Sequence, residues 1–140
     1  MQQTWRIKDR LVTTTLPAVM GIINATPDSF HAASRADVDG ALRLAERMIL
    51  DVGGQSTRPG SDDGTAYLES ARVLPVIEAI HQRFPAALIS VDTWRAVVAS
   101  EAVAAGASLV NDIGAGLRDA AMLPTVARLG VPYVAMHMQG

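Results

Sequence analysis

The hydrophobic positions of the chain form two alternating kinds of segment. Short runs rich in Val and Ile show no regular alternation of apolar and polar residues, and they lie at residues 18–23, 48–52, 87–91, 108–113 and 131–138. Such runs are typical of strands that are buried on both faces, as in a parallel sheet. Between them, apolar residues recur with the i, i+3, i+4, i+7 spacing of amphipathic helices, at residues 38–49, 68–84, 97–105 and 121–129.

Residues with special backbone preferences mark the ends of these helices. Asp37 precedes the first helix and is a suitable N-cap. Gly106 and Gly130 follow the third and fourth helices and are suitable C-caps. Pro75 lies inside the second helix, where its missing N–H group predicts a bend or a boundary.

The first helix meets the second strand without a loop, because no glycine or turn residue separates them. We therefore expect either a very short helix that ends near Ala45 or the loss of several residues before Asp51.

The alternation of strands and helices predicts right-handed crossovers and a parallel α/β sheet. A doubly wound sheet and a (β/α) barrel both fit this pattern. Residues 1–17 are more polar and predict a small N-terminal β-hairpin that turns at residues 8–10. We interpret residues 1–140 as one domain, with the hairpin at 1–17 and about five parallel strands and four helices at 18–140. A complete barrel needs about 250 residues, so a barrel of this length is incomplete.

Composition excludes several classes of protein. The chain has 12 Lys and Arg against 14 Asp and Glu, and this balance excludes a nucleic-acid binder that works by bulk positive charge. No apolar run approaches the roughly 18 residues of a membrane helix, and the first residues lack the apolar stretch of a signal peptide. The absence of Cys excludes disulfides, thiolate metal sites and a cysteine nucleophile. We expect a cytoplasmic protein.

Polar side chains end every apolar run. They are Asn24, Asp51, Asp92, the pair Asn111 and Asp112, and His137. The carboxyl ends of parallel strands meet at one edge of a sheet or barrel, and this edge is where active sites lie. The loop at residues 51–60 lies at the same edge and adds Gly53 and Gly54, which permit close approach of a ligand, and Arg58, whose forked donors suit a carboxylate or phosphate. The sequence therefore predicts one shared polar site.

The segments that carry these residues resemble dihydropteroate synthase. The similar segments are residues 21–30, 51–60, 90–93, 111–113 and 136–140, in the order and at about the spacing of that family. The resemblance implies the first half of a TIM barrel. It also implies condensation of 7,8-dihydropterin-6-methyl pyrophosphate with 4-aminobenzoate in folate biosynthesis, with release of pyrophosphate. Members of the family are targets of sulfonamides, which mimic 4-aminobenzoate.

The resemblance assigns Asp92 and Asn111 to pterin binding, where they can accept and donate along the guanidine-like edge of the ring. Loss of pyrophosphate leaves a cation delocalised on the pterin, and fixed carboxylates stabilise such a charge. Asp92 is the first candidate for this catalytic role and Asp51 the second. Met136 would pack against the pterin ring, although it is equally well explained as a core residue.

The remaining roles concern the leaving group and the second substrate. By resemblance, Asn24 supplies a side-chain oxygen to Mg²⁺, which neutralises the charge of pyrophosphate. Thr57, Arg58 and Pro59 match the loop that the family orders over 4-aminobenzoate and pyrophosphate.

The chain also departs from the family pattern. It lacks the later strands with their basic residues, and the loop at residues 30–36 is short. Half a barrel also has two unpaired edge strands. We therefore expect the complete protein to carry the activity and residues 1–140 alone to be inactive, and the resemblance implies a homodimer for the complete form. Two alternatives stay open: a non-catalytic half-barrel that binds pterin weakly or pairs with another chain, and a pterin-binding methyltransferase domain. The loop at residues 56–60 argues against the methyltransferase.

Overall fold

The structure is a computed structural model, and it describes residues 1–15, 18–25, 48–55 and 64–136. The N-terminal hairpin is confirmed. Strands β1 (Gln2–Ile7) and β2 (Arg10–Thr15) pair in antiparallel register, with Ile7 opposite Arg10. Lys8 adopts a positive φ of 55° in the two-residue turn between them.

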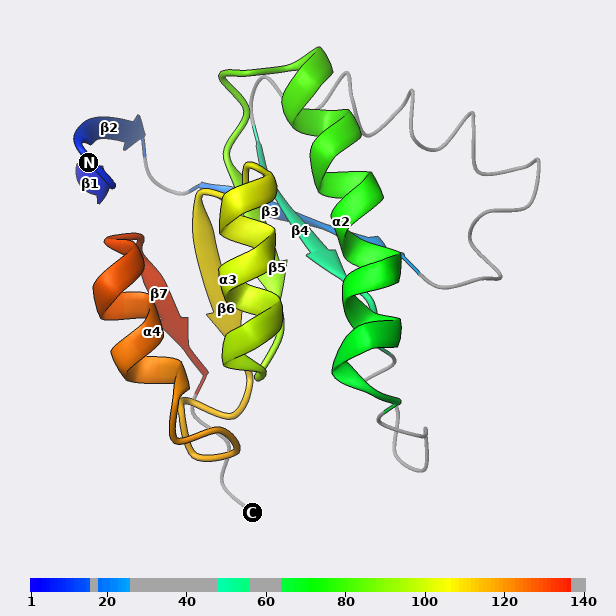
Figure 1. The fold of residues 1–140 in the computed structure, drawn as a ribbon. Helices are drawn as coiled ribbons and strands as arrows, with labels where there is room; N and C mark the ends of the chain where they lie inside the picture. The colour runs from blue at the N-terminus through cyan, green and yellow to red at the C-terminus, as the bar shows by residue number, and fades with distance from the viewer. Residues whose placement is uncertain (16–17, 26–47, 56–63, 137–140) are drawn as a thin grey trace.

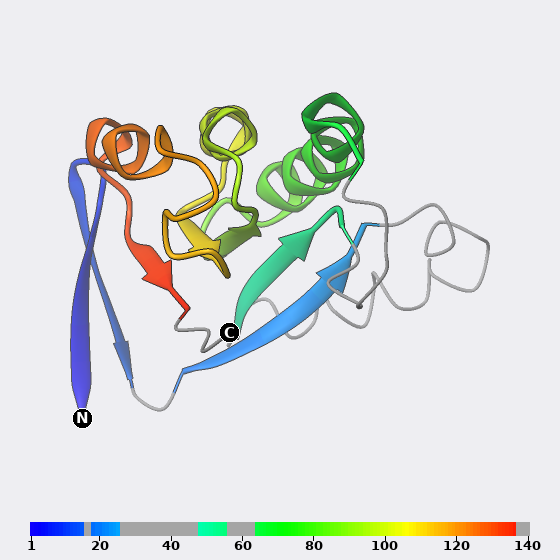
Figure 2. The same ribbon diagram turned by 90° about the horizontal axis from the view of Figure 1, so that it is seen from below.

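The main sheet has five parallel strands in the order β3-β4-β5-β6-β7. They are β3 (Val19–Asn24), β4 (Met48–Gly53), β5 (Ile89–Asp92), β6 (Leu109–Asp112) and β7 (Tyr133–Ala135). The strand order follows the chain order without reversal. The described helices all lie on one face of a curved sheet (Figures 1 and 2); they are α2 (Ala66–Arg83), α3 (Ala96–Ala105) and α4 (Met122–Leu129). Consecutive units of a barrel have strands in chain order and helices on one face of the sheet. In a doubly wound sheet the strand order reverses and helices cover both faces.

The core lies between the sheet and the helices. Val52, Val91 and Val110 are in register on neighbouring strands and are fully buried. They pack in one cluster with α2 and α3 residues such as Val73 and Val98. Both faces of these strands are largely buried at their centres, which explains why the apolar runs do not alternate.

Local signals set the helix ends. The Thr65 hydroxyl accepts a hydrogen bond from the Leu68 N–H at 3.2 Å and caps α2. Gly106 and Gly130 end α3 and α4 with φ values of 124° and 65°, as predicted. No boundary occurs at Pro75: α2 continues through it, because Pro75 lies on the exposed side, where water can solvate the carbonyl that its ring leaves unbonded.

Strand β4 begins at Met48, whereas the expected end of the first helix near Ala45 lies outside the described residues. Met48 and Ile49, which fit the spacing of the first predicted helix, form the start of β4 and pair with Val19 and Met20 of β3. The second strand is therefore not shortened before Asp51. The rest of that predicted helix, residues 37–47, lies outside the described residues, so the described part contains three helices and not the four predicted. None of these three has the length and hydropathy that a membrane span requires.

Candidate functional site

The polar ends of the strands lie in one row. Asn24 is in register with Gly53, Gly53 with Asp92, and Asp92 with Asn111. Residues that are in register on parallel strands share a face of the sheet. This row is offset by one residue from the buried valines that pack on the helices, so its side chains project to the opposite face. Asp51 lies two residues before Gly53 and shares that face.

Asp51 and Asn111 are joined directly. The Asn111 Nδ2 donates a hydrogen bond to the Asp51 Oδ2 at 3.0 Å, and Asp51 is only 5% exposed. The other carboxylate oxygen, Oδ1, is buried and has no hydrogen-bond partner among the described residues. The fully buried Ser90 hydroxyl, beside Asp51 in register, also has none in this part of the chain. Buried polar atoms without a partner are uncommon, and these two neighbouring atoms can form hydrogen bonds with a ligand or water at this place.

Asp92 has an unusual acidity. Burial, followed by the negative charges of Asp51, Glu69 and Asp112, raises the pKa of Asp92 from 3.8 to about 6. Gly53 leaves room for this carboxylate, because a Cβ at Gly53 would lie 3.3 Å from the Asp92 Oδ2. A partly buried acid among other acids is costly in the free protein and is typical of a site that binds hydrogen-bond donors or positive charge.

Asp112, next to Asn111 in sequence, has a different role. Its carboxylate is 1% exposed and accepts hydrogen bonds from the N–H groups of Gly114 at 2.7 Å and Gly116 at 2.8 Å. It also accepts one from the Tyr133 hydroxyl at 2.7 Å, and burial together with this hydrogen bond raises the pKa of Tyr133. Asp112 therefore holds the turn after β6, on the helix side of the sheet.

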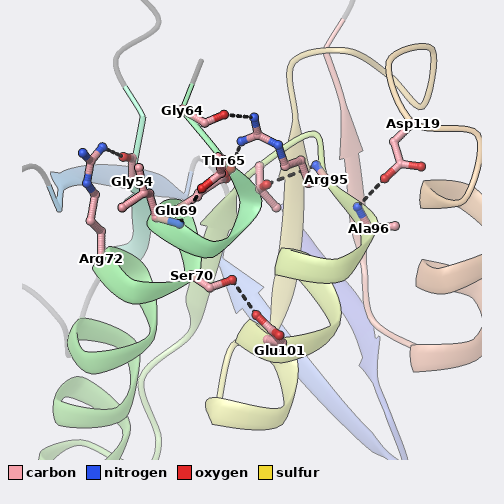
Figure 3. A network of polar contacts seen from close by, with 12 residues as sticks. Gly54, Gly64, Thr65, Glu69, Ser70, Arg72, Arg95, Ala96, Glu101 and Asp119 are labelled. Atoms are coloured by element: carbon pink, nitrogen blue, oxygen red, sulfur yellow. Dashed lines mark hydrogen bonds and ion pairs between the residues drawn. The ribbon is translucent and has the colours of Figure 1, made fainter. Parts of the chain in front are cut away.

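A second polar cluster, absent from the sequence predictions, joins α2 to the ends of β4 and β5 (Figure 3). Glu69 and Arg95 form a buried ion pair, and the Arg95 Nη2 donates to the Gly64 carbonyl at 2.9 Å. The Arg72 Nη1 donates to the Gly54 carbonyl at 3.0 Å. Arg95 follows the predicted site residue Asp92 by three positions, and this proximity is the signal that could have drawn attention to it.

The other predicted site residues are placed as follows. Asn24 is exposed at the end of β3, and Met136, just after β7, is 42% exposed. Thr57, Arg58 and Pro59 lie outside the described residues, as does His137.

The described residues offer limited means to hold a metal. They contain no group of three or more His, Asp or Glu residues that could hold one ion. The exposed amide oxygen of Asn24 fits a Mg²⁺ ion that takes its other oxygen ligands from a phosphate group and water.

Comparison with known proteins identifies the family. The family model described as pterin binding enzyme matches residues 20–140. The chain belongs to this family of pterin-binding enzymes.

Curated relatives agree with this assignment. The chain is 48% identical over 128 residues to the folic acid synthesis protein fol1 of Pneumocystis carinii, covering 87% of this chain and 17% of the relative. It is 44% identical over 133 residues to dihydropteroate synthase of Haemophilus influenzae, covering 90% of this chain and 48% of the relative. The chain thus spans about half the length of the dihydropteroate synthase and a smaller share of the fol1 protein.

Solved structures show the same fold. A dihydropteroate synthase from Vibrio fischeri superposes with a TM-score of 0.84 at 40% identity, covering 99% of this chain and 50% of that one. One from Xanthomonas albilineans with 4-aminobenzoic acid gives 0.85 at 43% identity, covering 100% and 53%. The predicted resemblance to dihydropteroate synthase is confirmed, and the chain corresponds to about half of each of these two structures.

Proposed function

We propose that this chain forms the pterin-binding half of a dihydropteroate synthase. The observation that carries the proposal is the joining of Asp51, Asp92 and Asn111 on one face of the sheet, at the ends of three adjacent strands. The site combines a partly buried acid, a fixed amide and an unsatisfied carboxylate oxygen. These groups suit a flat heterocycle whose edge carries several N–H donors.

The hydrogen bond between Asp51 and Asn111 decides which atoms remain for the ligand. Because the Asn111 Nδ2 already donates to Asp51, the Asn111 Oδ1 is directed elsewhere and can accept from a pterin N–H. The Asp92 carboxylate can accept two parallel N–H groups from the guanidine-like edge. The two N–H groups donated to the Asp92 carboxylate favour its ionised form, so pterin binding offsets the cost that raises the pKa of Asp92.

The reaction that we propose breaks the bond between the pterin methylene carbon and the pyrophosphate oxygen, and the electron pair leaves with pyrophosphate. The cation that remains is delocalised over the pterin, next to the carboxylates of Asp92 and Asp51. Fixed negative charge in a site that excludes water stabilises such a cation as it forms. The amine of 4-aminobenzoate then forms the new C–N bond and loses a proton.

Other residues would bind the charged parts of the substrates. Asn24 fits as a ligand of Mg²⁺, which when bound would neutralise charge on pyrophosphate. By resemblance, Thr57, Arg58 and Pro59 would contact 4-aminobenzoate and pyrophosphate. Met136, partly exposed beside the last described strand, would pack on the pterin ring. We further propose that the complete protein is cytoplasmic, is inhibited by sulfonamides and forms a homodimer.

The test is the formation of dihydropteroate and pyrophosphate by the full-length gene product that carries this sequence. We expect the wild-type protein to form both products only when both substrates are present. Asp92→Asn removes the charge without changing shape, and we expect it to lower kcat/KM by about 100-fold or more, as loss of one transition-state contact does. Failure of the wild-type protein to form dihydropteroate, or full activity of the variant, would contradict the proposal.

A further inference from the structure

The buried ion pair between Glu69 and Arg95 has no part in the proposed chemistry. Glu69 is 1% exposed in the first turn of α2, and the Arg95 side chain is 11% exposed just before α3. The Arg95 guanidinium also donates to the Gly64 carbonyl and lies 4.2 Å from the centre of the Trp94 ring. Figure 3 shows the guanidinium held between the Glu69 carboxylate and the Gly64 carbonyl, and the Trp94 ring adds an aromatic face to these contacts.

These contacts fix the turn that follows Asp92. The Arg95 N–H donates to the Thr93 hydroxyl at 3.1 Å, and the Thr93 N–H continues the sheet by donating to the Asn111 carbonyl at 3.0 Å. The three residues after Asp92 are therefore tied both to β6 and, through the Arg95 side chain, to α2. Little freedom is left for the backbone that carries the Asp92 carboxylate.

Glu69 also borders the site from the other side. A Cβ at Gly54 would lie 3.1 Å from the Glu69 carbonyl oxygen, and the preceding Gly53 contacts Asp92 in the same way. The α2 turn that holds Arg95 is therefore packed against the strand end that faces the Asp92 carboxylate.

Stability alone is a poor explanation of this pair. Removing two charges from water is costly, and a buried ion pair commonly gives no more stability than apolar residues of similar volume. What an ion pair with a planar guanidinium does provide is a fixed geometry.

Resting on the proposed function, we propose that Glu69 and Arg95 are positioning residues for pterin binding: Arg95 fixes the turn that directs the Asp92 carboxylate toward the ring, and Glu69 fixes Arg95.

The pair also places charge near Asp92, which gives a readout specific to this role. In the part of the chain that the structure describes, the charged groups near Asp92 are Asp51 on β4, Glu69 on α2 and Asp112 on β6, and Arg95 before α3 pairs with Glu69. Glu69 raises the pKa of Asp92. Glu69→Gln keeps the size of the side chain but removes that charge, so Asp92 should ionise at lower pH.

The experiment measures the affinity of the full-length gene product for 7,8-dihydropterin-6-methyl pyrophosphate by calorimetric titration, from about pH 4.5 to 8. We expect wild-type affinity to fall as the pH drops through about 6, where Asp92 takes up a proton. For Glu69→Gln we expect about 10-fold weaker binding at high pH and a midpoint about half a pH unit lower. Comparison at each pH with the wild-type protein removes the titration of the ligand itself.

Glu101→Gln is the matched control. Glu101 is an exposed residue of α3 that accepts a hydrogen bond from Ser70 of α2, so the variant makes the same chemical change between the same two helices. Glu101 is not among the groups that shift the pKa of Asp92. We expect both its pterin affinity and its midpoint to match those of the wild-type protein.

Four results would contradict the inference or the proposed function on which it rests. Wild-type affinity and midpoint in Glu69→Gln overturn the inference, and so does weaker binding with an unchanged midpoint, because that is the result of a merely structural role. If Glu69→Gln does not fold, Arg95→Lys replaces it: this variant keeps the charge but loses the forked donor, and wild-type affinity in it overturns the inference. Absence of pterin binding by the wild-type protein contradicts the proposed function itself.

Discussion

Asp92→Asn should make the protein more stable while it removes function. The substitution replaces a carboxylate that is partly buried and faces the charges of Asp51, Glu69 and Asp112 with a neutral group of the same shape. We expect the free energy of unfolding to increase near neutral pH. Such a gain is common when an active-site residue is replaced, because these residues serve function at a cost in stability.

The magnitude follows from the pKa. An acid whose pKa is higher in the folded protein binds its proton more tightly there, so its contribution to stability is largest at low pH and is lost as the pH rises. For Asp92 this loss occurs between pH 3.8 and about 6. The full displacement of the pKa corresponds to about 3 kcal/mol. Because Asp92 is partly accessible to water, solvent screening reduces this value, and we expect a gain of about 1–2 kcal/mol from Asp92→Asn above pH 6.

The assay is urea unfolding of the full-length wild-type and variant proteins at about pH 8 and about pH 4. We expect the stabilisation at the higher pH and little difference at the lower. Glu78→Gln, which removes an exposed carboxylate of α2, is the control and should change stability by less than about 0.5 kcal/mol. A variant that is equally stable or less stable than the wild-type protein at the higher pH would refute the reasoning.

Two further predictions concern residues on either side of the site. Tyr133→Phe removes one of the three hydrogen bonds to the buried Asp112 carboxylate, and we expect a loss of about 1–2 kcal/mol in urea unfolding with unchanged pterin affinity, since the contact lies on the helix side of the sheet; weakened pterin binding would place Asp112 in the site. Arg58→Ala should raise the KM for 4-aminobenzoate about 10-fold or more and leave pterin affinity unchanged, since a forked donor to a carboxylate is lost; steady-state kinetics with an unchanged KM would remove Arg58 from that role.

The sequence predicted the parts of the fold that depend on local signals. The strands at 87–91 and 108–113 correspond to β5 and β6, and Gly106 and Gly130 end helices because each adopts a positive φ. Met48 and Ile49 were ambiguous because they fit a helix and a strand equally well. Hydrogen bonding to β3, which lies far away in the sequence, decides between the two.

The site was predicted in outline but not in its details. Parallel strands bring their carboxyl ends together, so the grouping of Asp92 with Asn111 followed from the fold class alone. The neighbours Asn111 and Asp112 have separate roles because successive side chains of a strand point to opposite faces. Apart from the nearness of Arg95 to Asp92, the Glu69–Arg95 pair has no local signature, since only the packing of α2 against the strand ends brings the two residues into contact.

The most direct test of the account is a crystal structure of the full-length protein with a dihydropterin bound. We predict that the ring lies across the ends of β4, β5 and β6, with its N–H edge within hydrogen-bond distance of the Asp92 carboxylate and the Asn111 side-chain oxygen. A dihydropterin bound at full occupancy elsewhere on the protein, with these two side chains making no contact to it, would contradict the assignment of this site.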